Sequence, residues 1–166
     1  HSNASVSGRT ATTTYNGLAQ HFTISNTTNI NFGTPTSGAT RSGNDFYATN
    51  ARSGAYTVTV SLTSTTNYCW GSDGGTDTAS KTLSLTINKA SYNMTGVRWN
   101  YSSAFTYDGS AKTVSLTGLP SGVTAHYSNN SKTAAGSYTA SVTFSYDTTN
   151  YNAPSSISNC NWVINK

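Results

Sequence analysis

The chain has 166 residues, a net charge of +4 and only 8% charged residues, with no glutamate. This polar but weakly charged composition fits neither an acidic disordered segment nor a helical protein, and no stripe of Lys and Arg indicates nucleic-acid binding. β-Branched and aromatic residues are common and strong helix formers are scarce, so the composition favours strands. No apolar run approaches the length of a membrane span.

An internal repeat divides the chain into two predicted domains, residues 1–89 and 90–166. Four motifs recur in the same order: Tyr-Asx-Gly at 15–17 and 107–109, Gly-x-Tyr-Thr at 54–57 and 136–139, Thr-Thr-Asn-Tyr at 65–68 and 148–151, and Ile-Asn-Lys at 87–89 and 164–166. No Gly/Ser or Pro linker separates the copies. We therefore expect the last strand of the first domain to lead almost directly into a strand over residues 92–100.

The first domain begins with a hairpin-type turn at residues 16–17. Strands are predicted over residues 56–62 and 83–87, where apolar and polar residues alternate. Period two places one set of side chains in the core. The predicted core residues are Val58, Val60, Leu62, Leu85 and Ile87.

The second domain repeats this order, with turns at residues 108–109 and 118–122 and a strand at 123–127. The alternating strands span residues 138–146 and 160–164. Their predicted core residues are Ala140, Val142, Phe144, Trp162 and Ile164. Short strands at this spacing, separated by turns, predict an all-β protein made of antiparallel β-sandwiches.

Residues 100–166 resemble the bacterial immunoglobulin-like repeats of the MBG type. The resemblance is carried by the Tyr-x-Gly turn, Gly-Leu-Pro-x-Gly-Val at 118–123, Ala-Gly-x-Tyr-Thr at 135–139, Asn-Tyr and the closing Ile-x-Lys. The first repeat is similar but divergent: it lacks the Gly-Leu-Pro turn, is longer between residues 24 and 52, and has an insertion at 69–80.

The resemblance implies two tandem immunoglobulin-like sandwiches from a secreted or wall-attached bacterial protein, where such repeats act as stalks or adhesive modules. It implies no catalytic residues, so we expect a non-catalytic, extracellular, monomeric segment without a cofactor. One alternative is that the loops of the first domain bind a glycan or a host surface protein. Another is that the segment is an accessory region of a larger secreted hydrolase. Fold alone does not decide between these functions.

The inserted loop at residues 69–80 is the candidate ligand-binding site, with Trp70, Asp73 and Asp77. Inserted loops at the end of a sandwich often carry recognition, and an exposed aromatic ring can stack on a sugar. The plain alternative is that Trp70 caps the core and that both acids are solvated. Two Asp residues without a bidentate Glu are a poor calcium site, so no metal site is expected.

The other reactive side chains are expected to be structural. The histidines at 1, 21 and 126 are not spaced as metal ligands or as part of a catalytic triad. Cys160 follows the inward alternation of its strand, and Cys69 is predicted a whole domain away from it, so no disulfide is expected.

Three further residues could take part in binding or crosslinking chemistry. Trp99 and Tyr101 lie on a predicted early strand of the second domain, where rings commonly pack across strands, so packing is favoured over sugar binding. Lys112 is a candidate for an internal Lys–Asn amide crosslink. Its equivalent in the first repeat is Gln20, however, so no crosslink is expected.

Overall fold

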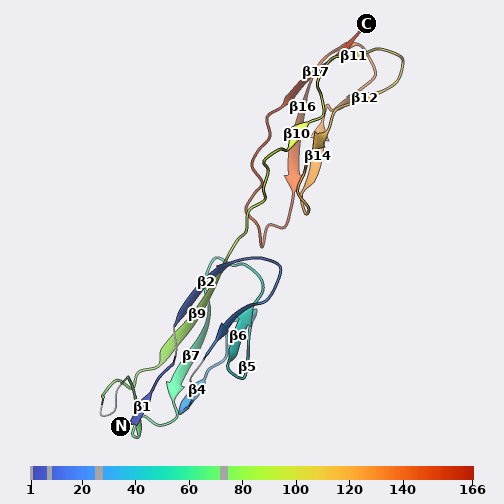
Figure 1. Ribbon diagram of the computed structural model, residues 1–166. Helices are drawn as coiled ribbons and strands as arrows, with labels where there is room; N and C mark the ends of the chain where they lie inside the picture. The colour runs from blue at the N-terminus through green and yellow to red at the C-terminus, as the bar shows by residue number, and fades with distance from the viewer. Residues whose placement is uncertain (1, 7–8, 25–27, 72–74) are drawn as a thin grey trace. The chain divides into compact units, whose positions relative to one another are not determined.

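A computed structural model describes residues 2–6, 9–24, 28–71 and 75–166 (Figure 1). The protein is all-β, and the described residues contain no helix. The chain divides into two compact units between Ala90 and Ser91, called unit 1 and unit 2 below. The sequence predicted a boundary between residues 89 and 90.

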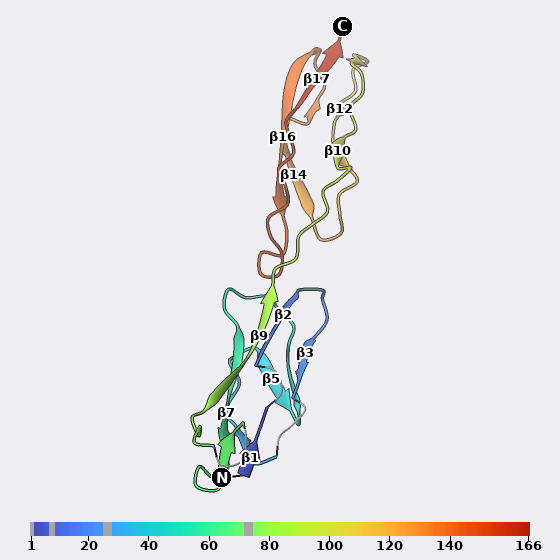
Figure 2. The same ribbon diagram turned by 60° about the vertical axis from the view of Figure 1, so that its left-hand side comes forward.

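Unit 1 is built from two larger sheets and one short two-stranded sheet. A four-stranded sheet has the order β2-β9-β7-β4, a three-stranded sheet has the order β3-β6-β5, and β1 pairs with β8 (Figure 2). The strands are β1 (Ser2–Ala4), β2 (Thr10–Thr14), β3 (Gln20–Thr23), β4 (Ile30–Phe32), β5 (Ala39–Ser42), β6 (Asp45–Ala48), β7 (Tyr56–Leu62), β8 (Tyr68–Trp70) and β9 (Lys81–Asn88).

The core of unit 1 takes side chains from both sheets. Strand β7 alternates as predicted, with every second residue buried, and β6 contributes Phe46 and Ala48 from the other sheet. Burial on one face of each sheet is what stabilises a sandwich-like arrangement. All five core residues predicted for this half are buried: Val58, Val60, Leu62, Leu85 and Ile87.

Unit 2 has a four-stranded sheet in the order β11-β17-β16-β14 and two short ribbons, β10-β13 and β12-β15 (Figure 1). The strands are β10 (Arg98–Trp99), β11 (Phe105–Thr106), β12 (Lys112–Thr113), β13 (Leu116–Thr117), β14 (Thr124–Ser128), β15 (Ser131–Lys132), β16 (Gly136–Ser145) and β17 (Cys160–Asn165).

The core of unit 2 is smaller than the sequence predicted. Ala140, Trp162 and Ile164 are buried as expected, but Val142 and Phe144 are only half-buried. Val142 and Phe144 lie on the same face of β16 as Ala140, as predicted. The core, however, ends nearer to Ala140 than the sequence predicted. The reason is that β17 begins opposite Ala140 and no strand covers β16 beyond that point on this side.

The strand predicted over residues 92–100 is reduced to β10, Arg98–Trp99. A turn interrupts it: the Val97 N–H donates to the Met94 carbonyl at 3.2 Å, and Gly96 has a φ of 85°. Such a backbone conformation favours glycine and is incompatible with a continuous strand.

The sheets are not purely antiparallel, which corrects the sequence prediction. In unit 1, β2 runs parallel to β9, with Thr10 opposite Ser84. In unit 2, β11 runs parallel to β17, with Phe105 opposite Ile164. β1 and β8 are also parallel. In both units an early strand therefore lies beside the last strand and points the same way.

The repeated motifs make the same backbone contact in both units. The tyrosine that opens each Tyr-Asx-Gly turn donates its N–H to the end of the last strand: Tyr15 to Asn88 and Tyr107 to Asn165, each at 2.9 Å. The sequence repeat is therefore also a repeat of local structure.

The tyrosine of each Gly-x-Tyr-Thr motif makes a second shared contact. Its hydroxyl donates to a backbone carbonyl a few residues upstream: Tyr56 to Asn50 at 2.7 Å and Tyr138 to Ala134 at 2.8 Å. Each bond ties the start of a long strand, β7 in unit 1 and β16 in unit 2, to the segment that precedes it.

Candidate functional site

Trp70 belongs to the core of unit 1. Only 8% of its surface is exposed, and it lies on β8 instead of in a projecting loop. Its indole N–H donates to the Ala79 carbonyl at 2.6 Å, and its backbone N–H donates to the Asp77 carbonyl at 2.8 Å. Burial of a large ring with a bonded N–H is favourable, so the hypothesis of a ring presented to a ligand is wrong.

Asp77 is exposed and forms an ion pair with Lys81 at 2.5 Å. The hydrogen bond from Lys81 is the main reason that the pKa of Asp77 is lowered. Its other carboxylate oxygen accepts the Ala79 N–H at 3.2 Å, so the side chain fixes its own loop. The third predicted site residue, Asp73, lies outside the described residues.

A small hollow of about 240 Å³ adjoins Trp70. Its lining includes two cationic residues, Arg9 and Lys81, and the other lining residues are Ala4, Ser5, Val6 and Gly71. Because Asp77 already pairs with Lys81, the positive charge available to a ligand is mostly that of Arg9.

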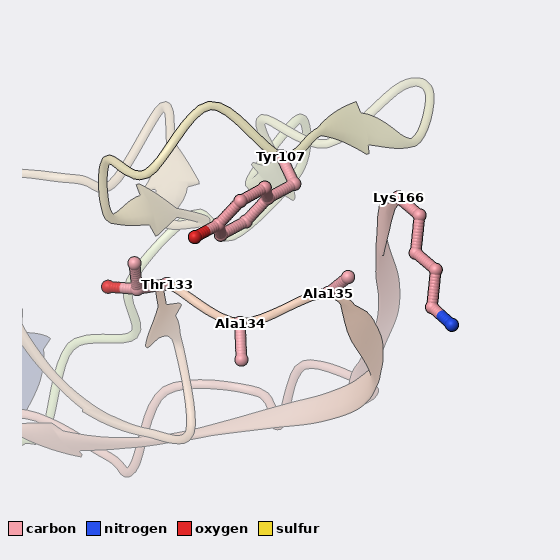
Figure 3. A pocket seen from close by; sticks show the side chains of 5 residues that line it. All are labelled: Tyr107, Thr133, Ala134, Ala135 and Lys166. Atoms are coloured by element: carbon pink, nitrogen blue, oxygen red, sulfur yellow. The ribbon is translucent and has the colours of Figure 1, made fainter.

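A larger open hollow, of about 510 Å³, lies in unit 2 beside Tyr107. Tyr107 is 51% exposed, and its ring lies across from residues 133–135 with the hydroxyl directed toward Thr133 (Figure 3). The Lys166 side chain lies beyond Ala135 and points away from the ring (Figure 3). The hollow thus offers an aromatic face, two alanines and a hydroxyl. In the sequence, Tyr107 is recognisable only as part of the Tyr-Asx-Gly turn, and its exposure was not predicted.

The equivalent residues of unit 1 are less exposed. Tyr15 is half-buried against the core, and Ala51 is buried. The Arg52 N–H donates to the Ile87 carbonyl at 3.3 Å, which draws this segment onto β9. The Tyr107 hollow is therefore a difference between two otherwise similar repeats.

A third hollow, of about 290 Å³, lies where β16 extends past β17. Val142, Phe144 and Tyr146 form one wall, and Ala153 and Pro154 form the other. It explains why two predicted core residues are only half-buried. Its lining has no charged side chain and is mostly apolar, with hydroxyl groups from Thr143, Tyr146 and Ser156.

The two cysteines are buried, and each of the two described histidines has a hydrogen-bonding partner. Cys69 and Cys160 are buried thiols, one in each unit, and burial raises the pKa of Cys160. The His21 Nδ1 lies 2.7 Å from a carboxylate oxygen of Asp45, and the His126 Nε2 lies 2.7 Å from the Ser145 hydroxyl.

Trp99 and Tyr101 take part in packing, as the sequence predicted. The Trp99 indole N–H donates to the Ser158 carbonyl at 2.8 Å, and its ring lies 5.6 Å from that of Tyr127. The Tyr101 hydroxyl accepts the Val163 N–H at 3.2 Å. Lys112 forms an ion pair with Asp108 at 2.5 Å.

Within residues 2–6, 9–24, 28–71 and 75–166, no three His, Cys, Asp or Glu side chains gather as metal ligands would. The same residues include no helix long and apolar enough to cross a bilayer. Comparisons of the sequence with protein-family models and with curated proteins gave no match.

Proposed function

We propose that this chain is a non-catalytic, load-bearing spacer of a bacterial surface protein, built from two immunoglobulin-like repeats of the MBG type. The proposal is supported by the repetition of local structure, with the Tyr15 and Tyr107 contacts and the Tyr56 and Tyr138 contacts made alike in both units. Asp77 and Asp108 are each engaged in an ion pair with a lysine, and Trp70 is packed in the core.

The observation that carries the proposal is the parallel pairing of an early strand with the last strand in each unit. When tension acts on the two ends of such a unit, it pulls these strands past each other along their length. The hydrogen bonds between them lie across the strands and are loaded together instead of one after another. This geometry resists force, as a spacer under tension requires.

The pairing also tells which backbone groups bear the load in unit 1. Arg9 accepts the Ser84 N–H at 2.8 Å, and the Tyr15 N–H donates to Asn88. Backbone groups alternate sides along a strand, so the odd-numbered residues of β2 face β9. Ala11 therefore donates toward β9, whereas the N–H of Thr12 faces away from it.

Single-molecule pulling of the two-unit chain tests the proposal with a matched pair of variants. Ala11→Pro removes a donor between β2 and β9, whereas Thr12→Pro places the same ring one residue along, where no strand pairs with β2. We expect Ala11→Pro to lower the unfolding force of one unit clearly more than Thr12→Pro does. Equal forces for the wild type and Ala11→Pro would contradict a load-bearing role for this pairing.

The exposed ring of Tyr107 favours a second function, adhesion through a glycan. An aromatic face beside the Thr133 hydroxyl suits a sugar, which presents both apolar and hydroxyl faces. A glycan array probed with the wild type, Tyr107→Ala and Tyr15→Ala tests this idea. Binding that is lost only in Tyr107→Ala would support adhesion, and binding that survives in it would exclude this hollow.

A further inference from the structure

The Asn16-Gly17 turn of unit 1 joins an exposed amide to a glycine in an open setting. A Cβ atom placed on Gly17 would meet nothing within 4 Å, and its φ is 82°. Asn16 Oδ1 accepts the backbone N–H of Leu18 at 3.0 Å. The ring closed by this bond contains the Gly17 nitrogen, so the side chain is folded back over the peptide that could attack it.

A second donor reaches the same oxygen. The Gln20 side-chain amide donates to Asn16 Oδ1 at 2.5 Å, and it is held there by the Thr13 hydroxyl, which lies 3.1 Å from Gln20 Oε1. Two N–H groups therefore converge on one amide oxygen. This is the arrangement that stabilises an oxyanion when a nucleophile adds to the carbonyl carbon.

We propose that Asn16 is a self-modification site, at which the turn promotes deamidation of its own asparagine. The Gly17 nitrogen loses its proton to water and attacks Cγ, and negative charge develops on Oδ1 beneath the Leu18 and Gln20 donors. The side-chain nitrogen takes up a proton and leaves as ammonia, which closes a succinimide ring. One water molecule then opens the ring to aspartate or isoaspartate. The net change is one water consumed and one ammonia released.

Unit 2 shows that this turn accommodates the aspartate product. Asp108 occupies the equivalent position, accepts the Ser110 N–H at 2.9 Å, and is followed by Gly109 with the same φ of 82°. Lys112 stands where unit 1 has Gln20 and pairs with the carboxylate. Conversion of Asn16 to aspartate would therefore make unit 1 more like its sister repeat.

The test measures the rate of deamidation in the folded protein near neutral pH. Peptide mapping follows a mass gain of about 1 Da at Asn16. Gln20→Glu keeps the size of the side chain and the acceptor for Thr13, but replaces the donor with a negative charge. We expect the variant to deamidate roughly threefold to tenfold more slowly, the effect of losing one ordinary hydrogen bond. Thermal unfolding checks that both proteins are folded.

An independent test introduces the Asn16 and Gln20 arrangement into the equivalent turn of unit 2. The double variant Asp108→Asn with Lys112→Gln rebuilds the unit 1 arrangement, and Asp108→Asn with Lys112→Glu is its matched control. We expect the glutamine form to deamidate faster than the glutamate form, as in unit 1. Equal rates for the glutamine and glutamate forms in either unit overturn the proposal.

Discussion

At the scale of single residues, Asp108 gives a pH-dependent prediction. The hydrogen bond from Lys112 lowers the pKa of Asp108 from its usual 3.8 to about 2, and the Ser110 N–H contributes. A carboxyl group whose pKa is depressed by folding stabilises the folded state above its unfolded pKa. That contribution is lost as the pH falls from 3.8 through about 2.

Carboxyl titration by NMR measures this directly. We expect Asp108 to titrate near pH 2 in the wild type and to move toward 3.8 in Lys112→Met, because the largest cause of the shift has been removed. Asp77, which has its own partner in Lys81, serves as the internal control. An Asp108 titration that is unchanged in Lys112→Met would show that the ion pair does not form in solution.

Among the strands, a fully packed position can be compared with one at the end of a core, because each has a phenylalanine. Phe46 on β6 is fully buried, whereas Phe144 lies on the part of β16 that β17 does not reach. We expect Phe46→Ala to destabilise unit 1 by about 3–5 kcal/mol, and Phe144→Ala to destabilise unit 2 by less than about 2 kcal/mol. Denaturant unfolding of each variant measures both. Equal losses would place Phe144 in a complete core.

The sequence predicted the faces of the strands better than their ends. Alternation alone identified the inward positions of β7 and β16, because side chains alternate along any strand. The end of the core at Ala140 depends on where β17 begins. Just before that point the Ser158 carbonyl is held by Trp99, a residue 59 positions away. Local patterns carry no information about such a contact.

The candidate site shows the same limit. Comparison of the two repeats reveals the insertion at residues 69–80. The burial of Trp70, however, depends on the pairing of β8 with β1 and on the hydrogen bond from its indole N–H to the Ala79 carbonyl. The Tyr107 hollow was missed because its motif is shared with unit 1. Tyr15 is half-buried and Tyr107 is exposed because the residues packed around the two tyrosines differ.

At the scale of the whole molecule, each unit has its own core, so each is expected to fold alone. Residues 91–166, expressed separately, should unfold cooperatively at the denaturant midpoint of one transition of the full chain. Residues 1–90 should reproduce the other transition. A fragment that stays unfolded would mean that the two units depend on each other for stability.

Stretching the wild-type chain from its two ends tests whether it bears load through its parallel strand pairs. Five residue pairs join β2 to β9, but only two join β11 to β17. We predict two unfolding events, each releasing roughly 25–30 nm of chain, with unit 1 opening at the higher force. Ala11→Pro identifies the event of unit 1. A chain that extends without resolved force peaks, or in which unit 2 unfolds at a higher force than unit 1, would show that the parallel strand pairs do not bear the load.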